Sequence, residues 1–366
     1  MTPPSRRRSP CAWPVISEGR VRNEPITDAL RSGAGVRGSI EIRQESVLSL
    51  ALPYRERLEV RRAVFRGGPG PRVAIVSGVH GDELEGLYVC HRLAHWIEQL
   101  AATQPEALRG QVELYPALNP LGLDTLVRFV PVFDADLNRM FPGHTEGLLP
   151  QRVAAAVIQH LAGAALVIDI HASNIFLREI PQVRISQDFA TGLLPVAREM
   201  NLDLIWLHGA QTVLETTIAH SLNERGVPCL VVEMGVGMRV TPAFADQLVV
   251  GILRTWRALG VLTPDVELPE LSHLPFVADD TNVHYLNAAT SGLFIPGVEH
   301  WMALREGDEL GRIVSPFDGG VRSTVRSPVD GVLFTLREYP LVYEGSLMAR
   351  IMAGPPAAGA TEAAHG

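Results

Sequence analysis

The stretch RVAIVSGVHGDELEG (residues 72–86) passes from an apolar run into glycine-rich backbone that carries a histidine and an acid three residues apart. Such a pattern is typical of a buried strand that ends in a turn and continues as a helix. Side chains that follow such a strand lie at the carboxyl edge of the sheet, where open α/β sheets bind their ligands. His80 and Glu83 therefore form half of a candidate site, and the other half must come from elsewhere in the chain.

The same alternation of strand and helix patterns continues along the chain. Apolar runs predict further buried strands over residues 111–118, 165–172, 202–209 and 228–235. Helical patterns interleave with them over residues 83–102, 149–164, 212–226 and 241–260. This alternation predicts an α/β fold with a mostly parallel mixed sheet and helices on both faces.

The chain is predicted to divide into four segments. Residues 1–45 are rich in Pro, Arg and Gly and are expected to form an N-terminal extension, partly disordered. The α/β domain is predicted over residues 46–265, and shorter β-like segments with frequent Gly and Pro follow over residues 266–354. Residues 355–366 are of low complexity and are predicted to be a disordered tail.

The β-rich segment contains an internal repeat. Residues 292–294 followed by REGDELGRI recur as residues 331–334 followed by YEGSLMARI, which places Arg312 and Arg350 38 residues apart. Two hairpin-like copies predict a small all-β, barrel-sandwich-like domain that resembles lipoyl and biotinyl carrier folds. The chain contains no lysine to carry either group, so a structural or substrate-gating role is expected instead.

Composition narrows the class of protein. The 366 residues are 46% hydrophobic and 20% charged, which is typical of a globular protein with about two domains. No apolar run approaches the roughly 20 residues that cross a bilayer, and the first 20 residues lack the apolar core of an export signal. A cytoplasmic location with no membrane partner is therefore expected. The formal net charge of −8 also disfavours a nucleic-acid partner.

The cationic residues and cysteines exclude several kinds of site. All 32 basic residues are arginine, so a pyridoxal-phosphate Schiff base and a P-loop lysine are excluded. The three cysteines lie far apart without a CxxC pair, which indicates neither a disulfide framework nor a cysteine zinc site. Cys90 and Cys229 stand in apolar surroundings and are expected to be core residues.

Two further strand ends can complete the candidate site. A hydrolytic zinc ion needs three protein ligands and an open fourth position. His171 closes the apolar run VIDIHAS, 88 residues after Glu83, and can supply the third ligand. Glu233 ends another such run, VVEMG, where a carboxylate is costly unless it has a partner or a chemical task. Activation of a metal-bound water and pairing with an arginine are the two alternatives.

A polar segment lies between the two halves of the site. Asp136, Asn138 and Arg139 cluster in DADLNR, with Asn119 and Arg128 upstream. An Arg–Asn pair near a metal can hold a substrate carboxylate through paired hydrogen bonds. A solvated loop is the alternative, although the flanking phenylalanines are expected to pin the segment to the protein.

Taken in order, GVHGDELEG, Asn119-Pro120, Arg128, DADLNR, DIHAS and VVEMG resemble the motifs of the succinylglutamate desuccinylase/aspartoacylase family of the zinc carboxypeptidase superfamily. The resemblance covers about residues 70–240. It implies one Zn²⁺ per chain, bound by His80, Glu83 and His171, with Glu233 as the general base. It also implies a β-rich C-terminal domain that narrows the mouth of the site.

The same resemblance implies roles for the polar segment. Arg128 would polarise the scissile carbonyl, Asn138 and Arg139 would hold the substrate carboxylate with Asn119 nearby, and Asp136 would orient a ligand histidine. The expected activity is hydrolysis of the amide bond in a small, carboxylate-bearing N-acyl amino acid. The alternatives are a metallocarboxypeptidase that acts on short peptides and a catalytically silent metal-binding scaffold. A homo-oligomer is compatible with all three functions. Four residues are candidates for selecting the substrate amino acid: Arg178, Arg184, Tyr339 and Tyr343.

Overall fold

The computed structural model describes residues 35–37, 40–54, 57–209, 215–272 and 274–354. Most of the predicted N-terminal extension and the whole predicted tail lie outside these residues, as does Cys11. Strands β1 (Gly35–Arg37) and β2 (Ile40–Leu50) pair within the predicted extension. The sheet therefore begins before residue 46, the predicted start of the α/β domain.

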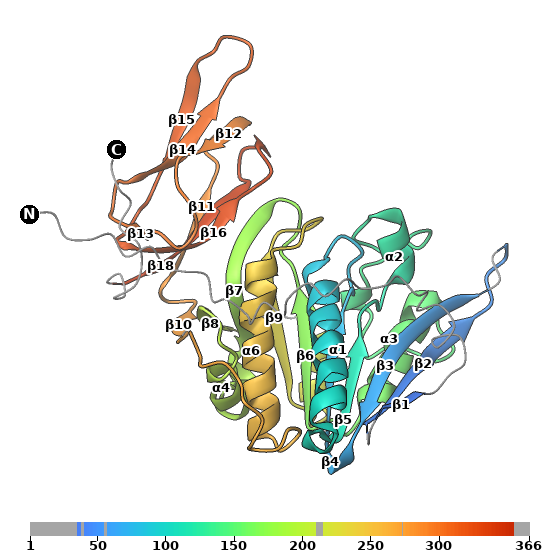
Figure 1. The fold of residues 1–366 in the computed structure, drawn as a ribbon. Coiled ribbons are helices and arrows are strands. Elements are labelled where there is room, and N and C mark those ends of the chain that lie inside the picture. Colours follow the sequence, from blue (N-terminus) through green and yellow to red (C-terminus); the bar gives the residue numbers. More distant parts are fainter. Residues whose placement is uncertain (1–34, 38–39, 55–56, 210–214, 273, 355–366) are drawn as a thin grey trace, which may run out of the picture.

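Most of the described strands form a large mixed sheet whose main path runs in the order β1-β2-β3-β5-β4-β6-β9-β7-β16-β18-β11 (Figure 1). Its central strands run parallel; they are β5 (Arg109–Tyr115), β4 (Gly68–Ser77), β6 (Leu166–His171) and β9 (Cys229–Gly235). Antiparallel neighbours flank them, namely β3 (Leu58–Arg66) on one side and β7 (Leu177–Ser186) on the other. Strands β8 (Leu204–His208) and β10 (Phe276–Asp279) extend the sheet beyond β7. The predicted α/β class with a mostly parallel, mixed sheet is confirmed.

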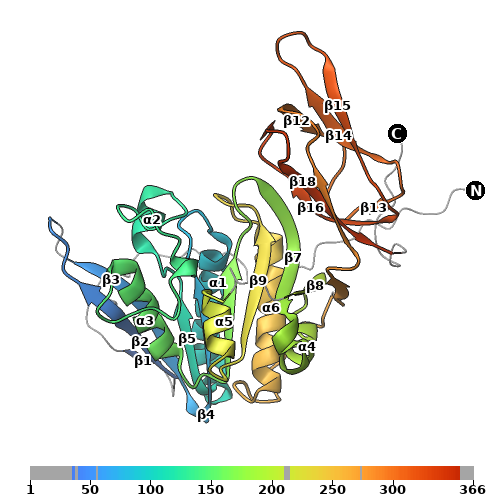
Figure 2. The same ribbon diagram turned by 180° about the vertical axis from the view of Figure 1, so that it is seen from behind.

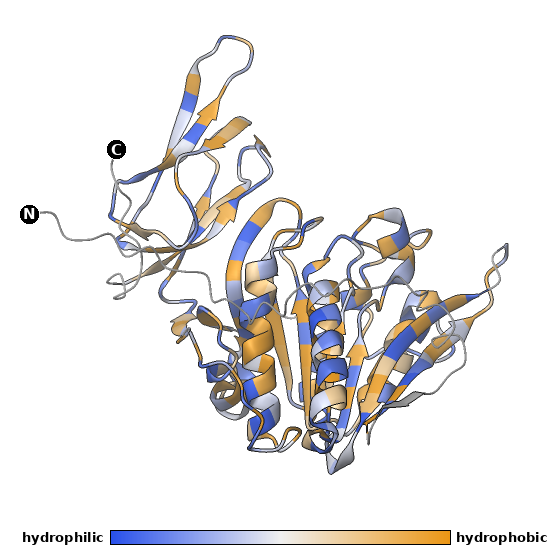
Figure 3. Ribbon diagram, viewed as in Figure 1, coloured by the Kyte–Doolittle hydropathy of each residue, from blue (hydrophilic) through white to orange (hydrophobic). Residues whose placement is uncertain are grey.

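Helices cover both faces of the central strands. Helices α1 (Glu85–Thr103) and α6 (Pro242–Ala258) lie on the face seen in Figure 1, and α3 (Leu149–Leu161) and α5 (Ile218–Asn223) on the face seen in Figure 2. Alternation along β4 explains the two cores, because Val73 and Ile75 pack beneath α1 and α6 while Ala74 and Val76 pack beneath α3. In Figure 3 the central strands are mostly hydrophobic, whereas the outward side of α1 is mostly hydrophilic.

Some elements differ from the sequence prediction. The helix predicted over residues 212–226 is limited among the described residues to α5, which begins after the cap residue Thr217. Strand β7, the helix α4 (Ala190–Arg198) and the strands before residue 68 were not predicted. The sequence of β7, LREIPQVRIS, interrupts its apolar residues with charges and a proline, so it lacks the continuous apolar run of the central strands.

The C-terminal segment is an antiparallel β-domain built on the predicted repeat. The first copy forms β12 (Gly292–Pro296) and β14 (Glu309–Val314), and the second forms β16 (Gly331–Arg337) and β18 (Leu347–Ala353). Phe294 pairs with Ile313 in the first copy and Leu333 with Ile351 in the second, and all four side chains share one core. The barrel-sandwich class stays a prediction, whereas the presence of an antiparallel β-domain is confirmed.

The remaining strands of this domain are β11 (Val283–Asn287), β13 (Ala303–Leu304), β15 (Val321–Arg326) and β17 (Leu341–Val342). Strands β15, β14, β12 and β17 form a separate sheet. Strand β16 pairs antiparallel with β7, Thr335 opposite Glu179, so the other sheet of the domain continues the sheet of the α/β domain. No helix among the described residues is both long and apolar enough to cross a membrane.

Candidate metal centre and active-site cavity

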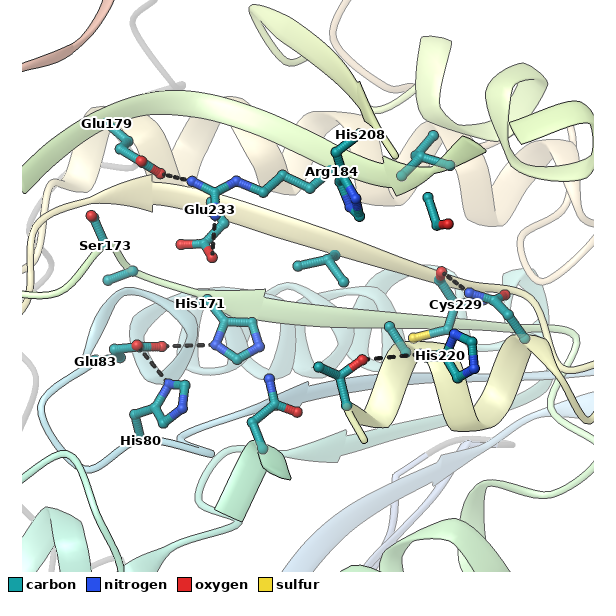
Figure 4. Close-up of a pocket in the computed structure, with 18 of the residues that line it drawn as sticks. His80, Glu83, His171, Ser173, Glu179, Arg184, His208, His220, Cys229 and Glu233 are labelled. Atoms are coloured by element: carbon teal, nitrogen blue, oxygen red, sulfur yellow. Dashed lines mark hydrogen bonds and ion pairs between the residues drawn. The ribbon is translucent and has the colours of Figure 1, made fainter. Parts of the chain in front are cut away.

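Three buried side chains converge at the carboxyl edge of the central strands (Figure 4). His80 and Glu83 stand in the turn between β4 and α1, and His171 is the last residue of β6, the parallel neighbour of β4. Nδ1 of His80 lies 2.7 Å from Oε1 of Glu83, and Nδ1 of His171 lies 2.9 Å from Oε2 of the same carboxylate. Their candidate ligand atoms all lie within 4.8 Å of one another. The strand order therefore brings together residues that are 88 positions apart.

The turn needs glycine to make this approach. A Cβ added to Gly81 would lie 2.0 Å from the backbone carbon of Gly122, in the short helix α2 (Pro120–Thr125). Only a residue without a side chain allows the two backbones to meet here. The glycines of the quoted stretch therefore position His80 and Glu83 against the loop that carries Arg128.

Each histidine has a second carboxylate at its other ring nitrogen. Nε2 of His80 lies 3.1 Å from Oδ1 of Asp136, and Nε2 of His171 lies 2.9 Å from Oδ2 of Asp169. Such carboxylates fix the orientation of a ligand imidazole and raise its basicity. Asp136 was among the predicted site residues, but Asp169 was missed. The sequence did indicate Asp169, because it stands two positions before His171 and therefore points to the same face of the strand.

Charge at the centre is balanced between carboxylates and imidazoles. Burial by itself would raise the pKa of Glu83, but His80 and His171 hold that pKa below its ordinary value. Burial likewise opposes charge on His171, but Asp169 and Glu83 raise its pKa well above the usual range. Two imidazole nitrogens and a carboxylate form a donor set suited to zinc. A zinc ion at this centre would displace the imidazole protons that the neighbouring carboxylates otherwise stabilise.

Arg128 approaches the same carboxylate from the loop after α2. Its guanidinium donates to Oε1 of Glu83 at 2.8 Å, and a second nitrogen lies 3.8 Å from Asp136. Asn119 holds this loop, because its amide nitrogen donates to the carbonyl oxygens of Arg128 and Phe129. The side-chain oxygen of Asn119 caps α2 by accepting from the backbone nitrogen of Gly122.

Asn119 is 2% exposed and is not among the described residues that line the cavity, and its side-chain bonds hold the loop of Arg128. The substrate-binding role expected for Asn119 stays a prediction. The sequence Asn-Pro indicates the capping role of Asn119, because an N-cap asparagine followed by proline at the first helical position is a common start of a helix.

Asn138 and Arg139 line the cavity from a short 3-10 helix, Leu137–Arg139. The side-chain oxygen of Asn138 accepts from the backbone nitrogen of Ile218, the first residue of α5, at 3.1 Å. Arg139 donates to the backbone oxygen of Asn138 at 2.8 Å. Asn138 thus links the 3-10 helix to the start of α5.

Glu233 lies beside His171, because the two residues are paired in the β6–β9 register. Its Oε1 accepts from Arg184 at 3.2 Å, and Arg184 also donates to Glu179 at 2.5 Å. The arginine pairing considered as an alternative for Glu233 is therefore present, yet Glu233 also lines the cavity with 16% of its side chain exposed. Burial raises the pKa of Glu233, and Arg184 offsets only part of that effect. A carboxylate with a raised pKa is a better proton acceptor near neutral pH.

The C-terminal domain contributes Arg350 to the lining of the cavity. Arg350 of β18 donates to Glu179 at 2.6 Å, and the guanidinium groups of Arg350 and Arg184 each lie 5.3 Å from the ring of Trp206. Of the four candidates for amino-acid selection, only Arg184 is among the described residues that line the cavity. The sequence contained no signal for Arg350 or Glu179, which meet only through the pairing of β7 with β16.

The cavity that contains these groups has a volume of about 310 Å³. The metal centre, Arg128 and Glu233 line one end of it. It continues to His208, His220 and Cys229, which lie away from His80 and Glu83 in Figure 4. The site thus combines a candidate metal centre, a buried carboxylate and several arginines in one cavity.

Comparisons with known proteins match this arrangement. A sequence model described as the succinylglutamate desuccinylase/aspartoacylase catalytic domain matches residues 69–259. The N-alpha-acetyl-L-2,4-diaminobutyric acid deacetylase of Halomonas elongata is 23% identical over 288 residues, which cover 76% of this chain and 80% of that protein.

Solved structures show the same fold. The product-bound ectoine utilization protein EutE (DoeB) from Ruegeria pomeroyi aligns with a TM-score of 0.72 at 20% identity, over 89% of this chain and 97% of that one. A succinylglutamate desuccinylase from Silicibacter sp. aligns with a TM-score of 0.73 at 20% identity, over 88% and 96%. The similarity extends through both domains.

Proposed function

The chain belongs to the succinylglutamate desuccinylase/aspartoacylase family, and on that premise we propose that it is a zinc-dependent amidohydrolase that cleaves small N-acyl amino acids. The observation that carries this proposal is the buried group His80, Glu83 and His171 beside Glu233 in one cavity. The name of the Halomonas relative, a deacetylase of an N-acetyl amino acid, supports the same reaction class.

His80, Glu83 and His171 would hold the zinc ion through the two Nδ1 atoms and the carboxylate that already face one another. When bound, the ion would lower the pKa of the attacking water and polarise the substrate carbonyl. Asp136 and Asp169 keep the two imidazoles oriented through their Nε2 atoms.

Glu233 is the proposed general base. It stands beside His171 at the end of β9, where it can accept the proton of the attacking water and return it to the leaving nitrogen. Arg184 and Glu179 hold its carboxylate in place. The arginine partner therefore serves the proposed catalytic role and does not compete with it.

Arg128 and Arg139 are the proposed contacts to substrate. Arg128 lines the cavity and bonds to Glu83 through one nitrogen, so its remaining N–H groups can donate to the carbonyl oxygen as negative charge develops there. Arg139, with Asn138, would hold the carboxylate of the amino acid, for which a planar guanidinium is suited.

Of the alternatives, a carboxypeptidase needs a wide cleft. The Arg350 side chain, which lines the cavity and bonds to Glu179, disfavours that alternative.

The direct test is a screen of acetyl-, succinyl- and formyl-amino acids with zinc-loaded protein. The proposal expects release of a free amino acid from at least one series, with activity lost after chelation and restored by zinc. Cleavage of C-terminal residues from short peptides, without any cleavage of N-acyl amino acids, would contradict it. Zinc binding without hydrolysis of either class would favour the silent scaffold.

A further inference from the structure

The cavity extends well beyond the metal centre along strand β9. Side chains alternate along a strand, so Glu233, Val231 and Cys229 share one face, and all three line the cavity. At a rise of about 3.3 Å per residue, the four steps from Glu233 to Cys229 span roughly 13 Å. Figure 4 shows Cys229 and His220 at the end opposite His80 and Glu83. An acetyl group has only two carbons, so this length must accommodate another part of the substrate.

Helix α5 closes this far end. The side-chain amide of Asn223 donates to the carbonyl oxygen of Cys229 at 3.0 Å and accepts from its backbone nitrogen at 2.9 Å. These two bonds fasten the end of α5 to the beginning of β9. We call the part of the cavity beside these bonds the distal pocket; His208, His220 and Asn223 line it together with the apolar Phe189, Leu193, Ala219, Cys229 and Val231.

The distal pocket combines five apolar side chains with two imidazoles and one amide. Leu193, Ala219 and Cys229 are buried, and burial raises the pKa of the Cys229 thiol well above its usual range, so the thiol is uncharged. The ring of Phe189 packs edge-on against that of His220, with centroids 5.7 Å apart. The flat rings of Phe189 and His220 lie beside small aliphatic side chains. This combination favours the packing of an aromatic or branched aliphatic group of the substrate.

Charged groups are arranged against an ionic occupant. Of the arginines that line the cavity, Arg128, Arg184 and Arg350 each bond to a glutamate, and Arg139 is assigned to the amino-acid carboxylate. The described acids nearest the distal pocket, Asp188 and Glu215, line the cavity from exposed positions. A side-chain ammonium in the pocket would therefore lose water without gaining a buried carboxylate as partner. Burial lowers the pKa of His208, so a side-chain carboxylate would gain no fixed positive charge there, and both losses are costly.

We propose that the distal pocket receives the side chain of the substrate amino acid and that this side chain is uncharged and largely apolar. The inference rests on the proposed function, in which Asn138 and Arg139 hold the amino-acid carboxylate. Asn138 accepts from Ile218 at the start of α5, so the carboxylate site and the distal pocket share one helix. The side chain is the group attached beside that carboxylate. The substrates are then N-acyl derivatives of phenylalanine- or leucine-like amino acids, unlike the diaminobutyrate of the Halomonas relative.

The first test measures kcat/KM of the zinc-loaded wild-type protein for N-acetyl derivatives of phenylalanine, leucine, alanine, aspartate and 2,4-diaminobutyrate. The kcat/KM for N-acetylphenylalanine or N-acetylleucine should exceed that for N-acetylalanine by about 10–200-fold. This is the range that one additional methylene contributes in an apolar pocket. The two charged substrates should fall below alanine. Preference for aspartate or diaminobutyrate would overturn the proposal. A gain that instead follows lengthening of the acyl group on alanine would assign the pocket to the acyl chain and also overturn it.

The second test fills the pocket. Ala219→Phe should lower the ratio of kcat/KM for N-acetylphenylalanine over N-acetylalanine by about tenfold or more. Ala102→Phe makes the same change at an exposed position of α1 and should leave that ratio unchanged. If Ala219→Phe does not fold, Val231→Phe places the ring from the strand side. An unchanged ratio in a folded variant contradicts the proposal.

Binding of the free product separates the two levels of inference. Calorimetric titration of wild-type protein should show tighter binding of L-phenylalanine than of L-aspartate, and the opposite order would contradict the distal pocket. Failure to hydrolyse any N-acyl amino acid would refute the proposed function. Hydrolysis with another side-chain preference would refute only the assignment of the pocket.

Discussion

Asp169→Asn should weaken zinc binding although it leaves the three proposed ligands in place. Asp169 is fully buried and accepts from Nε2 of His171 at 2.9 Å, so its negative charge acts on that imidazole without screening by water. Asparagine keeps the shape and an acceptor oxygen but removes the charge. A hydrogen bond to a charged group contributes about 1.5–3 kcal/mol and a neutral one about 0.5–1.5.

The expected loss is therefore about 1–1.5 kcal/mol, or roughly tenfold in zinc affinity. Asp169→Ala removes the acceptor as well and should reach the roughly 100-fold upper range for such partners. Asp136→Asn is the matched control at His80. The Asp136 side chain is 18% exposed, so water replaces part of its effect and the loss should be smaller.

Zinc affinity is measured by competition with a chelator of known affinity, which does not depend on catalysis. Thermal unfolding of the zinc-free variants shows whether each one still folds. Equal zinc affinity in wild type and Asp169→Asn would refute the reasoning, because it would mean that the buried carboxylate does not act on the metal through His171. A larger loss in Asp136→Asn would contradict the argument from exposure.

Three further predictions concern the residues around the centre. Arg139→Lys should impair substrates that bear a carboxylate more than their carboxamides, because an ammonium lacks the planar fork; equal effects on both would remove Arg139 from the carboxylate site. Arg184→Gln should shift the acidic limb of the kcat/KM–pH profile to higher pH, because Arg184 lowers the pKa of Glu233 and the base must be deprotonated to act; an unmoved limb argues against Glu233 as that base. Asn119→Ala should lower the free energy of unfolding by about 0.5–2 kcal/mol and reduce kcat by releasing the Arg128 loop, and unchanged stability in a denaturant titration would contradict its role as the α2 cap.

The central part of the fold follows from sequence pattern alone. Uninterrupted apolar runs mark β4, β6 and β9, and parallel neighbours end at the same edge of a sheet. His80, Glu83, His171 and Glu233 each follow or end such a run. Their convergence is therefore a consequence of strand order, and it could be expected without any coordinates.

Other parts of the site depend on pairings that no local pattern reveals. Strand β7 carries Glu179 and Arg184 on the face toward the cavity, and these charges break the apolar run by which a buried strand is recognised. Arg350 reaches Glu179 from 171 positions along the chain, through the pairing of β16 with β7. Residues that serve a site from an irregular strand or a second domain are predictable only once that pairing is known.

The central claim is that Glu233 is a base beside a three-ligand zinc centre, and one measurement tests it most directly. Zinc content and hydrolysis are determined together for Glu233→Gln, with His80→Ala for comparison. Glu233→Gln should keep about one zinc per chain and lose activity by about 10²–10⁴-fold, whereas His80→Ala should lose both metal and activity. Loss of zinc from Glu233→Gln would make Glu233 a ligand, and full activity with zinc retained would contradict the proposed mechanism.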